Sequence, residues 1–333
     1  MYMKTKKISG LEVMLLVLIY ALSAVFTFLI IKRSPYMYDK FYFTFPVKAI
    51  LFLFLGIAGY ILAHKYGKMT IHKYGWIIGV LDCLLMICER YFINSSILQN
   101  CILLINPIAI IGTAAFTYSV LNKKSPIKWI AMLLPIFMFI LNDNVSRVAL
   151  LAIYILLIMF LIKEKNSNKV ILTLYSLLLL FGAFVLINNF IQACSDFGYQ
   201  VHNKGYMANV IAEGLKTAKI FGEAAVSADG DRKTFILYYI IMNFGFSVAT
   251  TMIILTGVLE AIIFKSAHSS KTKTEKFTAY SVFLLLLVKI IISLLTNFGI
   301  VLNGIFTLYP ILSFAQFEAL AMFFILGLSA KIQ

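Results

Sequence analysis

Five ionisable side chains interrupt long apolar stretches of this sequence: Lys48, Asp82, Glu260, Lys289 and Glu318. An ionisable group at membrane depth is expensive, so each marks a candidate functional site. Lys48 and Glu260 lie near the ends of their stretches and are expected to reach the membrane interface along their own side chains. Asp82, Lys289 and Glu318 lie deeper. A Lys289–Glu318 pair could be either a structural ion pair or a substrate contact.

Two further carboxylates, Asp229 and Asp231, lie in the longest connection between apolar stretches. An Asp-x-Asp pair can hold a metal ion, but such pairs are frequent by chance and we predict no metal site. No Walker loop, GxGxxG, HExxH or CxxC motif occurs. The sequence therefore offers no recognisable machinery for ATP hydrolysis, dinucleotide binding or histidine-ligated metal chemistry, and we predict no cofactor.

The composition requires a membrane. Of 333 residues, 62% are hydrophobic and 13% charged, and the mean hydropathy is +0.94. A soluble domain carries about a quarter charged residues, so a soluble enzyme, a disordered protein and a disulfide scaffold are excluded. We predict an all-α polytopic membrane protein that forms a single integral domain over residues 1–333. The four cysteines have no metal-ligand spacing and are interpreted as packing residues.

Ten stretches approach the length of about 20 apolar residues that a membrane-spanning helix needs. They are Leu11–Ile31, Phe45–Ala63, Gly75–Cys88, Cys101–Leu121, Ile127–Leu141, Val148–Ile162, Val170–Ile191, Phe235–Phe264, Phe277–Leu295 and Ile311–Ala330. The third, fifth and sixth are short. The first is too long and too uniformly apolar for a cleaved signal peptide.

The basic residues orient these spans. With the N-terminus inside, 17 of the 29 Lys and Arg residues fall on cytoplasmic segments and ten on outer ones. Half of those ten lie in one long loop, where charge constrains topology least. The Lys32–Arg33 pair on the outer side fits least well. We predict a multi-pass membrane protein with both termini cytoplasmic. The net charge of +15 is then a topology signal, and no nucleic acid partner is expected.

The long outer connection spans residues 192–234 and contains an amphipathic stretch near residues 206–221. The apolar residues Met207, Val210, Ile211, Leu215 and Ala218 share one helical face. This pattern predicts a helix at the membrane surface or in the mouth of the bundle. The connection is either an outward-facing site for a charged lipid headgroup or a plain solvated loop.

Several short segments resemble motifs of the SEDS family (shape, elongation, division and sporulation; the FtsW/RodA/SpoVE proteins). Asn297, Gly299, Pro310 and Ser313 match its Asn-Ile-Gly and Pro-Phe-x-Ser-Tyr-Gly-Gly stretches. Ala315 and Gln316 replace the paired glycines. Asn106-Pro107 is similar to its Gln-Pro-Ser-Glu, with Ala109 at the Glu position.

The same order continues elsewhere in the chain. Leu141–Arg147, with Asp143, is similar in position to the family's Gln-Pro-Asp-Leu-Gly-Thr. Gly198-Tyr199-Gln200 is similar to its Gly-Tyr-Gln, and Asn243–Phe246 to its Glu-Glu-x-Gly-Phe. Ten spans with the largest outer loop between the seventh and eighth is also the family's layout.

The resemblance implies a cell-envelope glycosyltransferase that acts in cell division or cell shape. Such proteins polymerise glycan strands from the lipid-linked peptidoglycan precursor, usually with a class B penicillin-binding protein. The expected partners are therefore this precursor, that protein and membrane lipids. The candidate substrate-binding residues are Arg147, Arg232, Lys233, Lys289, Asn297, Pro310, Ser313 and Glu318.

The chain departs from the family at its catalytic position. The family has an Asp just before the eighth span, and counting back from Gly245 places Thr234 there. A threonine hydroxyl is not a base near neutral pH. Asp231 and Asp229 are the candidate replacements, and the chain is either a member with a shifted carboxylate or one that has lost catalysis.

Two other classes stay open. An O-antigen polymerase or ligase also has about ten spans and a large outer loop, but typically relies on loop arginines and a histidine. Here the loop offers Arg232 and His202. A transporter or lipid flippase would use Lys289 and Glu318 as pathway charges, although no inverted repeat is evident.

Overall fold

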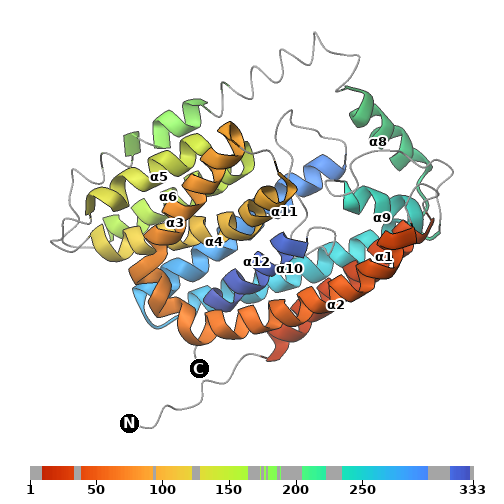
Figure 1. The fold of residues 1–333 in the computed structure, drawn as a ribbon, viewed down its shortest axis with the longest axis horizontal. Helices are drawn as coiled ribbons and strands as arrows, with labels where there is room; N and C mark the ends of the chain where they lie inside the picture. The colour runs from red at the N-terminus through yellow and green to blue at the C-terminus, as the bar shows by residue number, and fades with distance from the viewer. Residues whose placement is uncertain are drawn as a thin grey trace.

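The computed structural model describes an elongated bundle of helices (Figure 1). The described residues are 10–33, 39–92, 95–121, 128–163, 173, 176–177, 179–185, 188, 205–222, 235–298 and 316–330. The helices are α1 (Gly10–Arg33), α2 (Asp39–Leu62), α3 (Lys68–Tyr91), α4 (Ser96–Leu121), α5 (Lys128–Leu141), α6 (Asn144–Ile162), α8 (Gly205–Thr217), α9 (Ile236–Phe244), α10 (Phe246–His268), α11 (Lys273–Asn297) and α12 (Gln316–Ser329). A π-helical turn over Ala63–Gly67 joins α2 to α3.

The predicted all-α polytopic class is confirmed. Seven of the described helical segments are long and apolar enough to cross a membrane, and α12 is a shorter apolar helix. The span predicted at Val170–Ile191 falls largely outside the described residues, although residues 179–185 are helical. The count of ten spans therefore stays a prediction. Helix α3 extends past the predicted Gly75–Cys88 at both ends, because the polar residues before Gly75 continue the helix beyond the apolar stretch.

Helices α3 and α4 pack together along most of their length, and glycines make this possible. A Cβ atom at Gly75 would overlap the backbone of Gly112 on the facing helix. Small residues at such crossings let helix backbones approach closely inside a membrane, where packing replaces the hydrophobic effect as the driving force. The closely packed α3 and α4 form one side of the bundle.

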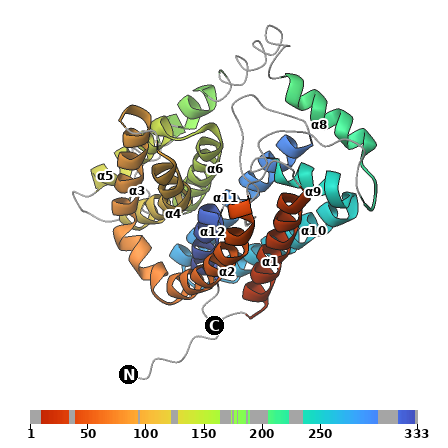
Figure 2. The same cartoon turned by 45° about the vertical axis from the view of Figure 1, so that its right-hand side comes forward.

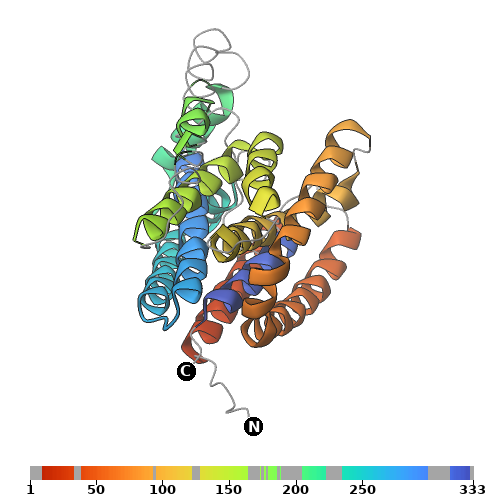
Figure 3. The same ribbon diagram turned by 90° about the vertical axis from the view of Figure 1, so that its left-hand side faces the viewer.

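Helix α12 lies among the other helices and connects the two sides of the bundle (Figures 1 and 3). It packs against α2, α4, α10 and α11. Phe323 of α12 lies edge-on to Tyr20 of α1 with ring centroids 5.8 Å apart, and Ser266 of α10 donates to the carbonyl of Ser329. Helix α12 therefore contacts helices from both the N-terminal and the C-terminal parts of the chain.

The predicted span Phe235–Phe264 is broken rather than continuous. Gly245 has φ +92° and separates α9 from α10, a backbone conformation that glycine adopts at little cost. The segment after α8 fills the break. Phe246 N–H donates to Lys219 O (3.0 Å), Ser247 N–H to Ile220 O (3.1 Å), and Gly222 N–H to Phe244 O (3.3 Å).

Helix α8 lies beside α9 at the edge of the bundle (Figure 2). It corresponds to the predicted amphipathic stretch near 206–221 but ends at Thr217. Ile211 on its apolar face is fully buried, and Gly214 lies directly against the ring of Tyr238 in α9. The helix ends early because the residues that follow pair with the α9–α10 break.

Candidate functional site

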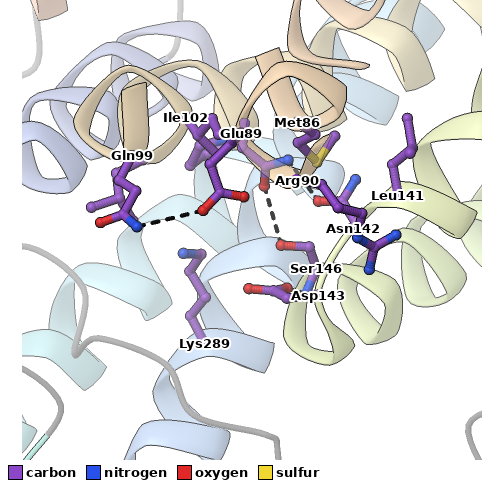
Figure 4. A pocket seen from close by; sticks show the side chains of 13 residues that line it. Met86, Glu89, Arg90, Gln99, Ile102, Leu141, Asn142, Asp143, Ser146 and Lys289 are labelled. Carbon is purple, nitrogen blue, oxygen red and sulfur yellow. Dashed lines mark hydrogen bonds between the residues drawn. The ribbon is translucent and has the colours of Figure 1, made fainter. Parts of the chain in front are cut away.

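A polar cavity of about 490 Å³ opens where α3 ends, α4 begins and α5 turns into α6 (Figure 4). Its lining residues are Met86, Glu89, Arg90, Gln99, Ile102, Leu103, Asn106, Pro107, Leu141, Asn142, Asp143, Ser146 and Lys289. Arg90, Gln99 and Asp143 are exposed and mark its open side. The cavity combines charged groups of both signs with hydrogen-bonding amides and an apolar strip.

Asn106 holds the inner wall of the cavity together. Its Nδ2 donates to Asp82 Oδ2 (2.8 Å) and to Asn142 Oδ1 (2.6 Å), and its Oδ1 accepts from Ser146 Oγ (3.1 Å). One amide thereby joins α3, α4 and the start of α6. Asp82 is fully buried, and its Oδ1 has no hydrogen-bond partner in the described part of the chain. We refer to Asp82, Asn106, Asn142 and Ser146 as the Asn106 network.

The Asn142–Arg147 turn is closed by its own polar groups. Asp143 Oδ1 accepts from Ser146 N–H (2.7 Å) and caps the N-terminus of α6, and Asn142 Nδ2 donates to Met138 O (2.8 Å). Arg147 donates to the carbonyls of Phe139 and Ile140, both at 2.9 Å. Backbone groups without water must find such partners, so the turn between two apolar helices is internally satisfied.

Lys289 and Glu318 form the ion pair that the sequence left open. Lys289 Nζ of α11 donates to Glu318 Oε1 of α12. Glu318 is buried behind the cavity, whereas Lys289 also lines it. An ammonium has three N–H donors, so the lysine can hold Glu318 and still face an anion in the cavity.

The prediction that the Glu260 side chain reaches the membrane interface was wrong. That side chain is only 7% exposed, and neither carboxylate oxygen has a hydrogen-bond partner among the described residues. The side chain lies inside the bundle and not at its surface, because other helices pack against α10. Lys48 on α2, in contrast, is exposed.

A further buried carboxylate that sequence reasoning missed is Glu12, which accepts from the hydroxyl of Tyr60 (2.9 Å). Its position inside the first apolar stretch was the available signal.

The seven remaining candidate residues lie outside the described part of the chain. They are Asp229, Asp231, Arg232, Lys233, Thr234, Pro310 and Ser313. Their roles stay predictions. Among the described residues, no group of three or more His, Cys, Asp or Glu side chains is placed to hold a metal ion.

Asn297, the first residue of the Asn-Phe-Gly segment, is fully buried at the end of α11. Its Oδ1 accepts from the backbone N–H of Tyr238 (2.9 Å), and its Nδ2 donates to Ser293 O (2.8 Å). It lies eight residues after Lys289, which is about 12 Å along a helix. The first turn of α9 begins at Ile236, two residues after Thr234. It is therefore attached to α11 at a point about 12 Å along the helix from Lys289.

No protein-family model and no curated protein sequence matches the chain. Solved structures do match, among them the following two. A chain of a peptidoglycan synthase complex that coordinates polymerization and crosslinking is 15% identical with a TM-score of 0.67, over 98% of this chain and 97% of that one. A variant of the rod shape-determining protein RodA from Thermus thermophilus is 14% identical with a TM-score of 0.61, over the same shares.

These similarities identify the architecture as that of the SEDS proteins, as the motif resemblance predicted. In particular, the helices follow the RodA fold along almost the whole chain. The chain is thus a multi-pass membrane protein with a RodA-like fold and a polar cavity walled by the Asn106 network.

Proposed function

We propose that this protein handles a lipid-linked glycan precursor in cell-wall peptidoglycan biogenesis, and that the polar cavity receives the precursor headgroup. The observation that carries the proposal is Lys289, a cation at the cavity wall that is held by a buried carboxylate. The RodA-like fold supports the class of substrate, although a fold by itself does not fix a function.

The lining suits a sugar pyrophosphate. Lys289 and Arg90 supply positive charge for phosphate oxygens. Gln99, Asn142 and Ser146 supply donors and acceptors for sugar hydroxyls, with Gln99 in contact with Glu89 (3.4 Å). Lys289, Asn142 and Ser146 are buried in the wall, where electrostatic interactions are stronger than in bulk water. The polyprenyl chain would remain in the surrounding lipid.

The sequence, in contrast, argues against catalysis by the family's usual route. A general base must come within about 2.6–3.2 Å of the acceptor hydroxyl, or one water away, and the aligned position holds Thr234. We propose that the chain binds the precursor and polymerises it poorly or not at all. If unmodified protein polymerises purified precursor and Asp231→Ala abolishes this, the carboxylate has shifted. Activity gained only by Thr234→Asp would indicate a retained site that lacks its base.

A partner and an orientation complete the proposal. Because a similar chain belongs to a peptidoglycan synthase complex, we propose a class B penicillin-binding protein as the partner. We also propose that the protein lies in the bacterial plasma membrane with both termini cytoplasmic, an orientation that the excess of basic residues on alternate connections supports.

Binding of the purified precursor to the protein in nanodiscs tests the proposal. Lys289→Met should weaken binding by at least about tenfold, because a charge-assisted hydrogen bond to phosphate is lost. The single variant leaves Glu318 buried without its partner, so the Lys289→Met/Glu318→Leu variant is measured beside it as the better-folded form. Lys48→Met, on the exposed side of α2, is the matched control and should bind normally. Wild-type affinity in the double variant would refute a headgroup site at Lys289.

A further inference from the structure

Helix α9 begins without a cap of its own. Its N-cap position is Phe235, whose side chain makes no capping hydrogen bond. The first N–H groups of a helix have no partner within the helix, and inside an apolar bundle water does not replace one. Helix α9 has only nine residues, so it also has few internal hydrogen bonds to offset an unpaired N–H group at its start.

Asn297 supplies the missing cap from another helix. A local N-cap side chain bonds the N–H of the second or third helical residue. Tyr238 is the third residue of α9, and its N–H donates to Asn297 Oδ1. The amide of Asn297 cannot turn away freely, because Nδ2 donates to Ser293 O and contacts Ser293 Oγ at 3.3 Å.

Asn297 is also badly placed to touch a ligand in the cavity. It is 0% exposed, and Lys289 is the α11 residue that lines the cavity. Asn297 instead bonds the first turn of α9, which begins at Ile236, two residues after Thr234. The other end of α9 is fixed separately by the backbone bonds at Gly245.

We propose that Asn297 is a positioning residue, which caps α9 from α11 and thereby fixes the chain next to position 234, without contacting the precursor. The functional part of this inference rests on the proposed function, whereas the capping part does not.

Two measurements on the full-length protein in nanodiscs test it. The first is hydrogen–deuterium exchange at the Tyr238 amide, which should become about fivefold faster in Asn297→Ala, as loss of a cap predicts. Asn297→Asp retains the acceptor for the Tyr238 N–H but loses the Nδ2 donor to Ser293 O, so exchange should rise less than in Asn297→Ala. Thr296→Val is the matched control, because the hydroxyl of this buried neighbour bonds only within α11 to Ile292 O. It should leave exchange at Tyr238 unchanged.

The second measurement is binding of the purified lipid-linked precursor. Asn297→Asp should bind like wild type if the residue only positions α9. An added negative charge beside a bound pyrophosphate would instead weaken binding at least about tenfold. Loss of binding in Asn297→Asp together with a protected Tyr238 amide would make Asn297 a contact residue and overturn the proposal. Unchanged exchange in Asn297→Ala would overturn it as well. If wild-type protein binds no precursor, the proposed function fails, and the exchange measurement still decides the capping.

Discussion

The cavity wall and the α8–α9 region both place polar groups inside an apolar bundle, but they satisfy them differently. In the wall, side chains bond to side chains: the Asn106 network joins three helices, and Lys289 pairs with Glu318. In the α8–α9 region, backbone bonds to backbone around Gly245, and Asn297 adds one side-chain cap. The wall should therefore be sensitive to side-chain chemistry and the α8–α9 region to backbone conformation.

Among variants of the cavity wall, those of the Lys289–Glu318 ion pair should change the free energy of unfolding most. Charge reversal by Lys289→Glu or Glu318→Lys alone leaves like charges buried together and should cost about 3–5 kcal/mol of unfolding free energy. Reversible unfolding in SDS-containing mixed micelles measures this. The Lys289→Glu/Glu318→Lys double variant should recover much of the loss. Strict additivity of the two single effects would show that the side chains do not interact.

The Asn106 network should give the next largest effect. Asn106→Leu leaves Asp82 buried with neither oxygen bonded, and we expect a loss of about 2–4 kcal/mol in the same assay. Replacing both partners, as Asp82→Leu/Asn106→Leu, should be less harmful than Asn106→Leu alone, because no carboxylate is then stranded. A double variant less stable than the single one would mean that Asp82 has another important partner.

Two glycines sharpen the other half of the comparison. Gly222 and Gly245 both have positive φ, at +89° and +92°, but a Cβ at Gly222 meets open space whereas one at Gly245 would overlap the backbone of Ile220. Gly222→Ala should cost about 1–2 kcal/mol from backbone strain alone. Gly245→Ala should cost about 1–3 kcal/mol more from the overlap. Equal costs would show that the packing of the 219–222 segment on the break contributes nothing.

The sequence could predict features that depend on the free-energy cost of a charge facing lipid, and features that lie within a single helix. The charge of Lys289 and Glu318 in apolar stretches was enough to suggest a pair, since neither could face lipid cheaply. The periodicity around Ile211 was enough to predict a helix with one buried apolar face.

What depends on several helices at once was not predictable. Glu260 was misjudged because its distance from the end of an apolar stretch says nothing about which helices cover it. The break at Gly245 was missed because a glycine in an apolar run resembles a packing residue until the 219–222 segment is seen beside it. The cavity itself needs Asn106 of α4 beside Asn142 and Ser146 of the α5–α6 turn, and the resemblance covered both segments without showing that they meet.

Photo-crosslinking tests the central claim, that the cavity receives the precursor headgroup, most directly. A photoreactive amino acid is placed at Ile102, which lines the cavity, and separately at Ile97 on the same helix, which is 76% exposed. With labelled lipid-linked precursor, we expect crosslinking at position 102 that excess unlabelled precursor abolishes, and little competed signal at position 97. Equal labelling at the two positions, or labelling at 102 that unlabelled precursor leaves unchanged, would contradict the account.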